Sequence, residues 1–186
     1  MSKTRKKSVS SSTSPSLKQA LEIQAKLERQ VGELYTTFAS MFDEQPDLQT
    51  LWSTMAQEEE GHASQVLAVQ NKGRSDSGQD LALLLSAEIL DSLGSRLAEY
   101  QQQAQAGVSL DQAFRITWEL ESSEFEFLRE ILVSSSNFAE LGFPTSMDEE
   151  SEERHVGRLR MAIQRHTTDE GLRREVQFLG GAESSR

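Results

Sequence analysis

Two copies of a Glu-x-x-His motif lie 93 residues apart in this chain, and each follows another glutamate by the same distance. The motifs are Glu59–His62 and Glu152–His155, and 31 residues before each motif stand Glu28 and Glu121. Residues i and i+3 of a helix share one face, so each motif presents an oxygen and a nitrogen to one point. The repeat therefore predicts two similar helical hairpins that face each other and supply ligands to one site.

The repeated residues interrupt apolar stripes of helical spacing. Glu59 follows Met55 by four residues, and His62 precedes Val66 by four. The other members, Glu28, Glu121, Glu152 and His155, lie in line with apolar residues in the same way. A charged side chain on a buried stripe is costly unless it is paired or binds a metal ion. This pattern predicts a metal centre inside a helical bundle, a ligand arrangement known for di-iron and di-manganese carboxylate proteins.

Helical spacing of apolar residues extends through most of the chain, and only three prolines interrupt it. We predict an all-α bundle over residues 15–166, with a hairpin at 15–72, a crossover helix at 79–105 and a second hairpin at 110–166. Ser14 is expected to cap the first helix, and capping boxes are expected at Ser109 with Gln112 and at Ser146 with Glu149. Gly107 is expected to end the crossover helix. Residues 1–14 form a basic, serine-rich tail, and 167–186 a loosely attached tail with a short helix at about 170–178.

Composition narrows the class of function. The net charge of −11 disfavours binding to nucleic acid or to anionic membranes and favours cations. No apolar run is long enough to cross a bilayer, and no secretory signal stands at the start, so a cytoplasmic location is expected. The chain has no cysteine, which excludes disulfides and thiolate-bound iron–sulfur clusters.

Three segments resemble motifs of the rubrerythrin family within the ferritin-like superfamily. They are ERQVGELY from Glu28 to Tyr35, EEEGH ending at His62, and Glu121-Ser-Ser-Glu124. The resemblance implies a ferritin-like four-helix bundle with an additional crossover helix and two iron ions, although manganese or mixed manganese and iron fits the same ligands. The implied ligands are Glu28, Glu59, His62, Glu121, Glu124, Glu152 and His155.

The resemblance also implies a reaction. A diferrous centre would reduce hydrogen peroxide to water, with Glu124 as a flexible ligand or proton relay. Tyr35 is either a core aromatic or a hydrogen-bond donor to a ligand carboxylate, and both roles are compatible. The family's rubredoxin module needs four cysteines, so an external electron-donor protein must supply electrons here.

Two other functions stay open from the sequence. The same site could oxidise ferrous iron with oxygen or peroxide, as in ferroxidases, or the bundle could be a metal-free structural protein. The intact ligand set argues against the metal-free bundle. The long linker permits a homodimer that exchanges hairpins. Trp52 and Trp118 are expected in the core, and His166 is expected to place a favourable charge at a helix C-terminus.

Overall fold

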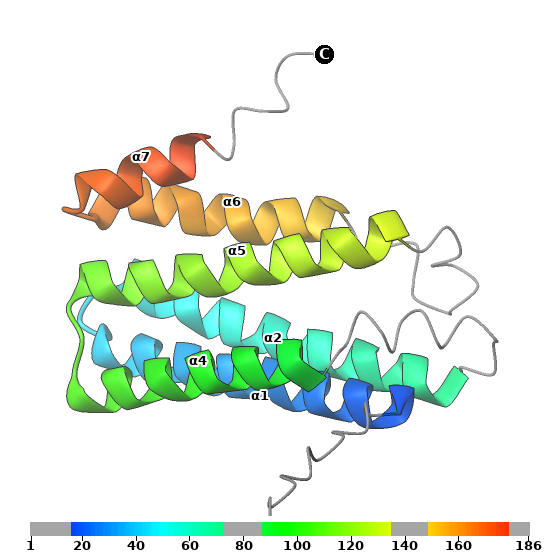
Figure 1. Cartoon of the computed structure of the whole chain (residues 1–186). Helices are drawn as coiled ribbons and strands as arrows, with labels where there is room; N and C mark the ends of the chain where they lie inside the picture. The colour runs from blue at the N-terminus through cyan, green and yellow to red at the C-terminus, as the bar shows by residue number, and fades with distance from the viewer. Residues whose placement is uncertain (1–15, 73–86, 135–148, 179–186) are drawn as a thin grey trace, which may run out of the picture.

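The computed structural model describes residues 16–72, 87–134 and 149–178, except for the side chains at 17, 69–72, 87–88, 123–134, 149–154 and 178. These ranges form helices joined by short turns and contain no strand, which confirms the all-α prediction (Figure 1). The helices are α1 (Leu17–Met41), α2 (Pro46–Lys72), α4 (Ala87–Ala106), α5 (Leu110–Ser134), α6 (Glu149–His166) and α7 (Glu170–Phe178). Within the described ranges, no helix is both long enough and apolar enough to cross a membrane.

Local sequence signals account for the helix ends. Ser16, and not Ser14, caps α1, because its hydroxyl accepts from the Gln19 backbone N–H at 3.3 Å while the Gln19 side chain accepts from the Ser16 N–H at 3.0 Å. Ser14 itself lies outside the described residues. The predicted capping box of α5 is confirmed by the reciprocal bonds of Ser109 and Gln112. Gly107 ends α4 with a φ of +92°, a conformation that glycine adopts without a steric penalty.

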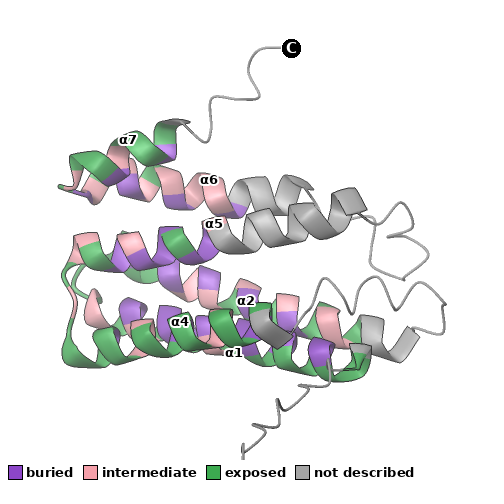
Figure 2. Ribbon diagram, viewed as in Figure 1, coloured by how far each residue is buried: buried purple, intermediate pink, exposed green. Residues whose placement is uncertain are grey.

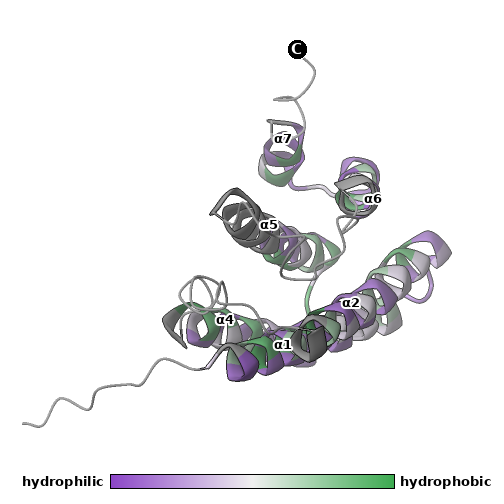
Figure 3. Cartoon of the chain, turned by 90° about the vertical axis from the view of Figure 1, so that its right-hand side faces the viewer, coloured by the Kyte–Doolittle hydropathy of each residue, from purple (hydrophilic) through white to green (hydrophobic). Residues whose placement is uncertain are grey.

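The helices form a bundle around one interior. The turn at 42–45 connects α1 to α2, and the two helices pack along each other. Helix α4 lies against α1. Helix α6 contacts both α2 and α5, and α7 packs on α6. Figure 3 shows α5, α6 and α7 above a row formed by α4, α1 and α2. The turns at 42–45, 107–109 and 167–169 all lie at the same end of the bundle (Figure 1). This arrangement brings the predicted ligand helices α1, α2, α5 and α6 to a common centre.

Aromatic side chains fill the interior near that end. Trp52 of α2 lies 5.5 Å from Phe38, 5.2 Å from Phe42 and 5.3 Å from Phe114, measured between ring centroids. The Trp52 indole N–H also donates to Thr117 Oγ1 at 3.1 Å. Trp52 and Trp118 are both buried, as the sequence predicts, and buried residues follow the inward faces of the helices (Figure 2). This cluster joins α1, α2 and α5 through apolar contacts.

Helix α7 is docked on the bundle, although the sequence assigns residues 167–186 to a loosely attached tail. Leu172 and Val176 are buried. Arg115 of α5 forms ion pairs of 2.7 Å with both Asp169 and Glu175. The predicted short helix is therefore present, but the apolar face of α7 and these ion pairs make it part of the folded unit. Residues 179–186 lie outside the described part of the chain.

Candidate metal centre

Four helices each place one acidic or imidazole side chain in the middle of the bundle. Glu28 of α1, Glu59 of α2, Glu121 of α5 and His155 of α6 are 7%, 0%, 7% and 4% exposed. All four come from the repeated positions of the sequence. The apolar stripes on which they lie turn towards the common interior, so burial of the stripes carries these polar groups inward with them.

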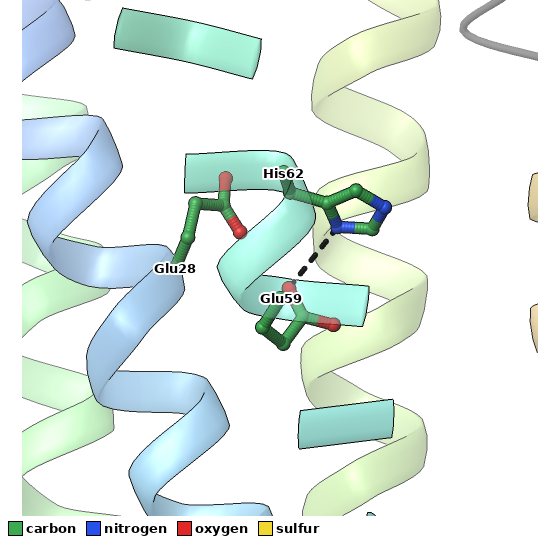
Figure 4. Close-up of side chains that lie close together, drawn as sticks. All are labelled: Glu28, Glu59 and His62. Atoms are coloured by element: carbon green, nitrogen blue, oxygen red, sulfur yellow. Dashed lines mark hydrogen bonds and ion pairs between the residues drawn. The ribbon is translucent and has the colours of Figure 1, made fainter. Parts of the chain in front are cut away.

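The ligand atoms fall into two overlapping groups. One contains Glu28, Glu59 and His62, and the other contains Glu59, Glu121 and His155; within each, one atom per residue lies within 4.8 Å of those of the other two. Figure 4 shows Glu28 of α1 directed towards α2, beside Glu59 and His62. Glu59 belongs to both groups, so its carboxylate lies between two clusters that could each hold a metal ion.

His62 lies nearer the surface than the other members. Its Nδ1 is 3.2 Å from Glu59 Oε2, and its side chain is 37% exposed (Figure 4). Its ring centroid is 6.3 Å from that of His155. The sequence places His62 on the apolar side of α2, and the structure agrees only in part, because the ring stands at the edge of that side.

The carboxylates are strongly perturbed by burial. Removal from water raises the pKa of Glu59 well above its usual range, and the charges of Glu121 and Glu28 raise it further. Burial also raises the pKa of Glu28. Among the side chains that the structure describes, none forms a hydrogen bond of standard geometry with Glu28 Oε2 or Glu59 Oε1. Buried carboxylate oxygens beside imidazole nitrogens are a donor set that could hold a metal ion, and the described residues fit such a site.

Two neutral side chains support the carboxylates. The Tyr35 hydroxyl donates to Glu121 Oε1 at 2.5 Å, which is the contact expected if Tyr35 assists a ligand carboxylate. Its catalytic role stays a prediction. The Gln24 amide donates to Glu28 Oε1 at 2.5 Å. Gln24 was not predicted as a site residue, although it stands four residues before Glu28 and therefore on the same face of α1.

His155 lies between two carboxylates. Its Nδ1 is 2.7 Å from Glu58 Oε2, and its Nε2 is 2.9 Å from Glu121 Oε2. Burial of the ring lowers its pKa, but Glu121, Glu58 and Glu59 outweigh burial and raise it to about 10. Among the described residues both contacts are ion pairs, and neither ring nitrogen makes a hydrogen bond of standard geometry. Glu58 was not predicted as a site residue, because its partner His155 is far away in the sequence.

The remaining predicted ligands are Glu124 and Glu152. Their helices α5 and α6 are present, but both side chains lie outside the described part of the chain. Each stands three residues from a described member of the centre, Glu121 and His155 respectively, and therefore one helical turn away. Both assignments stay predictions.

His166 lies away from the centre, as the sequence predicts. Its Nε2 is 2.7 Å from Asp47 Oδ2, so it joins the C-terminal end of α6 to the first turn of α2.

Fold and site together define an all-α bundle with buried carboxylate–histidine groups that could hold metal ions. Comparison with models of protein families, with curated proteins and with solved structures gave no match. The residues of this chain are therefore the basis on which its function can be inferred.

Proposed function

We propose that this protein is a non-haem di-iron oxidoreductase that reduces hydrogen peroxide to water with electrons from an external donor protein. The observation that carries the proposal is the position of Glu59, which is fully buried and shared by two carboxylate–histidine groups. Burying several negatively charged carboxylates together is unfavourable unless cations neutralise them. Two divalent ions would remove that cost by binding to the carboxylates of the cluster.

The described residues divide naturally between two metal positions. Glu28, Glu59 and His62 would hold one ion, while Glu59, Glu121 and His155 would hold the other. Glu124 and Glu152 would complete the set that the resemblance to rubrerythrins implies. Two bound ferrous ions would supply the two electrons that break the O–O bond of peroxide. Manganese would fit the same donor atoms, so metal identity is part of the proposal.

The chain's own residues would control protons and access. Peroxide takes up two electrons and two protons as it becomes two water molecules. The fully buried Tyr35 donates a hydrogen bond from its hydroxyl group to Glu121, at the edge of the cluster. Apolar residues on α2, including Met55 and Ala63, exclude water from one side. The exposed edge of His62 would admit a small oxidant.

Anaerobic reconstitution with Fe²⁺ tests metal binding first. Metal analysis should find about two iron ions per chain, and oxidation should produce the ultraviolet absorption of an oxo-bridged diferric centre. Glu59→Gln should reduce the iron content sharply. Glu60→Gln is the matched control, because the neighbouring Glu60 is exposed and pairs with Arg29 on the surface. Wild-type protein without iron, or equal iron in the two variants, would contradict the proposal.

Stopped-flow oxidation of the diferrous protein tests the reaction. A peroxidase should react much faster with hydrogen peroxide than with oxygen, and Tyr35→Phe should slow the peroxide reaction while leaving iron content unchanged. If oxygen reacts faster than peroxide, the peroxidase assignment is wrong even though the metal centre stands.

A ferroxidase is the second candidate, and the partial exposure of His62 favours it. A ligand at the surface gives iron a path for exchange with solvent, which an iron-handling protein requires. Excess Fe²⁺ separates the two functions. Turnover that continues beyond two irons per site would support the ferroxidase, whereas a single oxidation event would support the peroxidase.

A further inference from the structure

Glu58 contacts His155 through the ring nitrogen that does not face Glu121. Glu58 Oε2 lies 2.7 Å from His155 Nδ1, while His155 Nε2 lies 2.9 Å from Glu121. Arg158, one turn after His155 on α6, holds the same carboxylate through its Nη2, 2.6 Å from Glu58 Oε2. Glu58 is therefore held by a guanidinium group on the side of His155 that faces away from Glu121.

The other Glu-x-x-His motif lacks this arrangement in its sequence. The 93-residue repeat aligns Glu58 with Ser151, and it aligns Gln65 with Arg158. Serine carries no charge to place behind a histidine, and glutamine lacks the charge of a guanidinium group. Among the described side chains, the carboxylate that contacts His62 is Glu59 of the same motif. The two halves of the centre are therefore alike in their expected ligands but different in what stands behind them.

We propose that the Glu58–Arg158 pair positions His155 and makes the Glu59, Glu121 and His155 group the tighter of two metal positions. A carboxylate close to one ring nitrogen favours the proton on that nitrogen, orients the ring and leaves the opposite nitrogen to bind a metal ion. His155 is 4% exposed, whereas the His62 side chain is 37% exposed. This inference rests on the proposed metal binding and specifies the order in which the two ions bind. The first ion enters beside His155.

Calorimetric titration of the metal-free full chain with Mn²⁺, under anaerobic conditions, measures the two positions separately. Wild-type protein should show two steps of unequal affinity. His155→Ala should remove the tight step, and His62→Ala the weak one. Glu58→Gln should weaken the tight step roughly 10- to 100-fold and leave the weak step unchanged. Arg158→Gln should have a smaller effect of the same kind. Glu60→Gln, which breaks only the surface pair with Arg29, should change neither step.

Cobalt spectra distinguish positioning from a general effect on folding. At one equivalent of Co²⁺, the visible bands of Glu58→Gln should differ from those of wild type, and Glu58→Asp should partly restore them. A variant that merely loosened the bundle would weaken both steps together. If Glu58→Gln does not fold, Arg158→Gln and Glu58→Asp carry the same test.

The outcomes separate this inference from the proposed function. Wild-type protein that binds no metal ion would overturn both. Two steps of equal affinity in wild type, or equal weakening of both steps in Glu58→Gln, would overturn the role of Glu58 and leave the metal centre intact.

Discussion

Two stretches of the bundle, an aromatic one around Trp52 and a carboxylate one around Glu59, are equally buried but differ in polarity. Trp52 is 0% exposed and packs among Phe38, Phe42 and Phe114. Glu59 stands seven residues later on the same helix, is also 0% exposed, and lies beside Glu28 and Glu121. The aromatic stretch stabilises the fold with its own contacts. The carboxylate stretch lowers the stability of the metal-free fold, so equal burial has opposite energetic consequences.

The largest effect is expected where the aromatic stretch is broken. Trp52→Ala removes a fully buried indole and should lower the free energy of unfolding by about 3–5 kcal/mol, with or without metal. Urea denaturation of both forms measures this effect. Met161→Ala is a control, because its side chain is 64% exposed and its loss should change stability by less than about 0.5 kcal/mol. A loss near the control value for Trp52→Ala would show that the cluster does not hold the helices together.

Replacing the central carboxylate, Glu59, should change the stability of the metal-free protein in the opposite direction to Trp52→Ala. Glu59→Leu removes a buried oxygen that has no hydrogen-bond partner among the described residues, so the metal-free protein should gain about 1–3 kcal/mol. The same variant should lose the stabilisation that Mn²⁺ gives to wild type. Thermal unfolding with and without Mn²⁺ measures both effects. A destabilised variant that still responds fully to Mn²⁺ would remove the contrast between the two stretches.

Titration should reveal a smaller effect, because protonation relieves only part of the repulsion. The raised pKa values of Glu59 and Glu28 give stability that is present below about 4.5 and is lost as pH rises through their folded values. The raised pKa of His155 gives stability that is present below 6.5 and is lost as pH rises through about 10. The thermal unfolding midpoint of the metal-free protein should therefore decrease as the pH is raised from 5.5 to 9.

Bound Mn²⁺ should flatten that pH dependence, because the cations replace the protons as partners of the carboxylates. Glu59→Leu should flatten it partly. Trp52→Ala should lower the midpoint equally at every pH. A midpoint of the metal-free wild type that rises with pH would contradict the assigned directions.

The smallest effect concerns the backbone beside the carboxylates. A Cβ added at Gly32 would lie 3.2 Å from the Ala56 carbonyl oxygen and 3.4 Å from Glu59 Cβ, so α1 and α2 must separate slightly. Gly32→Ala should lower stability by about 1 kcal/mol after its gain in helix propensity is included, and it should weaken Mn²⁺ binding. Gly61→Ala is the matched control. Its Cβ would meet nothing within 4 Å, so it should add up to about 1 kcal/mol.

The sequence predicted the helices and the central carboxylates because both follow from spacing along a helix. Apolar periodicity placed the helix ends of α2, α4, α5 and α6 within a few residues wherever the structure describes them. The 93-residue repeat alone identifies Glu28, Glu59, Glu121 and His155. A helix face can be read locally, so residues that share the buried face could be predicted.

Other parts of the site depend on contacts between distant residues. Glu58 sits beside the buried stripe of α2, and only the packing of α6 against α2 brings His155 and Arg158 to it. The exposure of His62 depends on how closely neighbouring helices cover its edge, which periodicity does not measure. The capping box of Ser16 with Gln19 was present in the sequence, but the neighbouring Ser14 and Pro15 offered a competing start.

The described contacts of helix α7 do not include a predicted ligand, yet they hold in place two helices that carry ligands. Glu175 accepts from the Trp118 indole at 3.1 Å and pairs with Arg115, while the Gln164 amide of α6 donates to the Arg173 carbonyl at 2.7 Å. These contacts tie α7 to both α5 and α6, the helices that carry Glu121 and His155. A shortened chain that ended at His166 would free the angle between those two helices. Truncation designed to remove a dispensable tail should therefore keep every residue through Phe178.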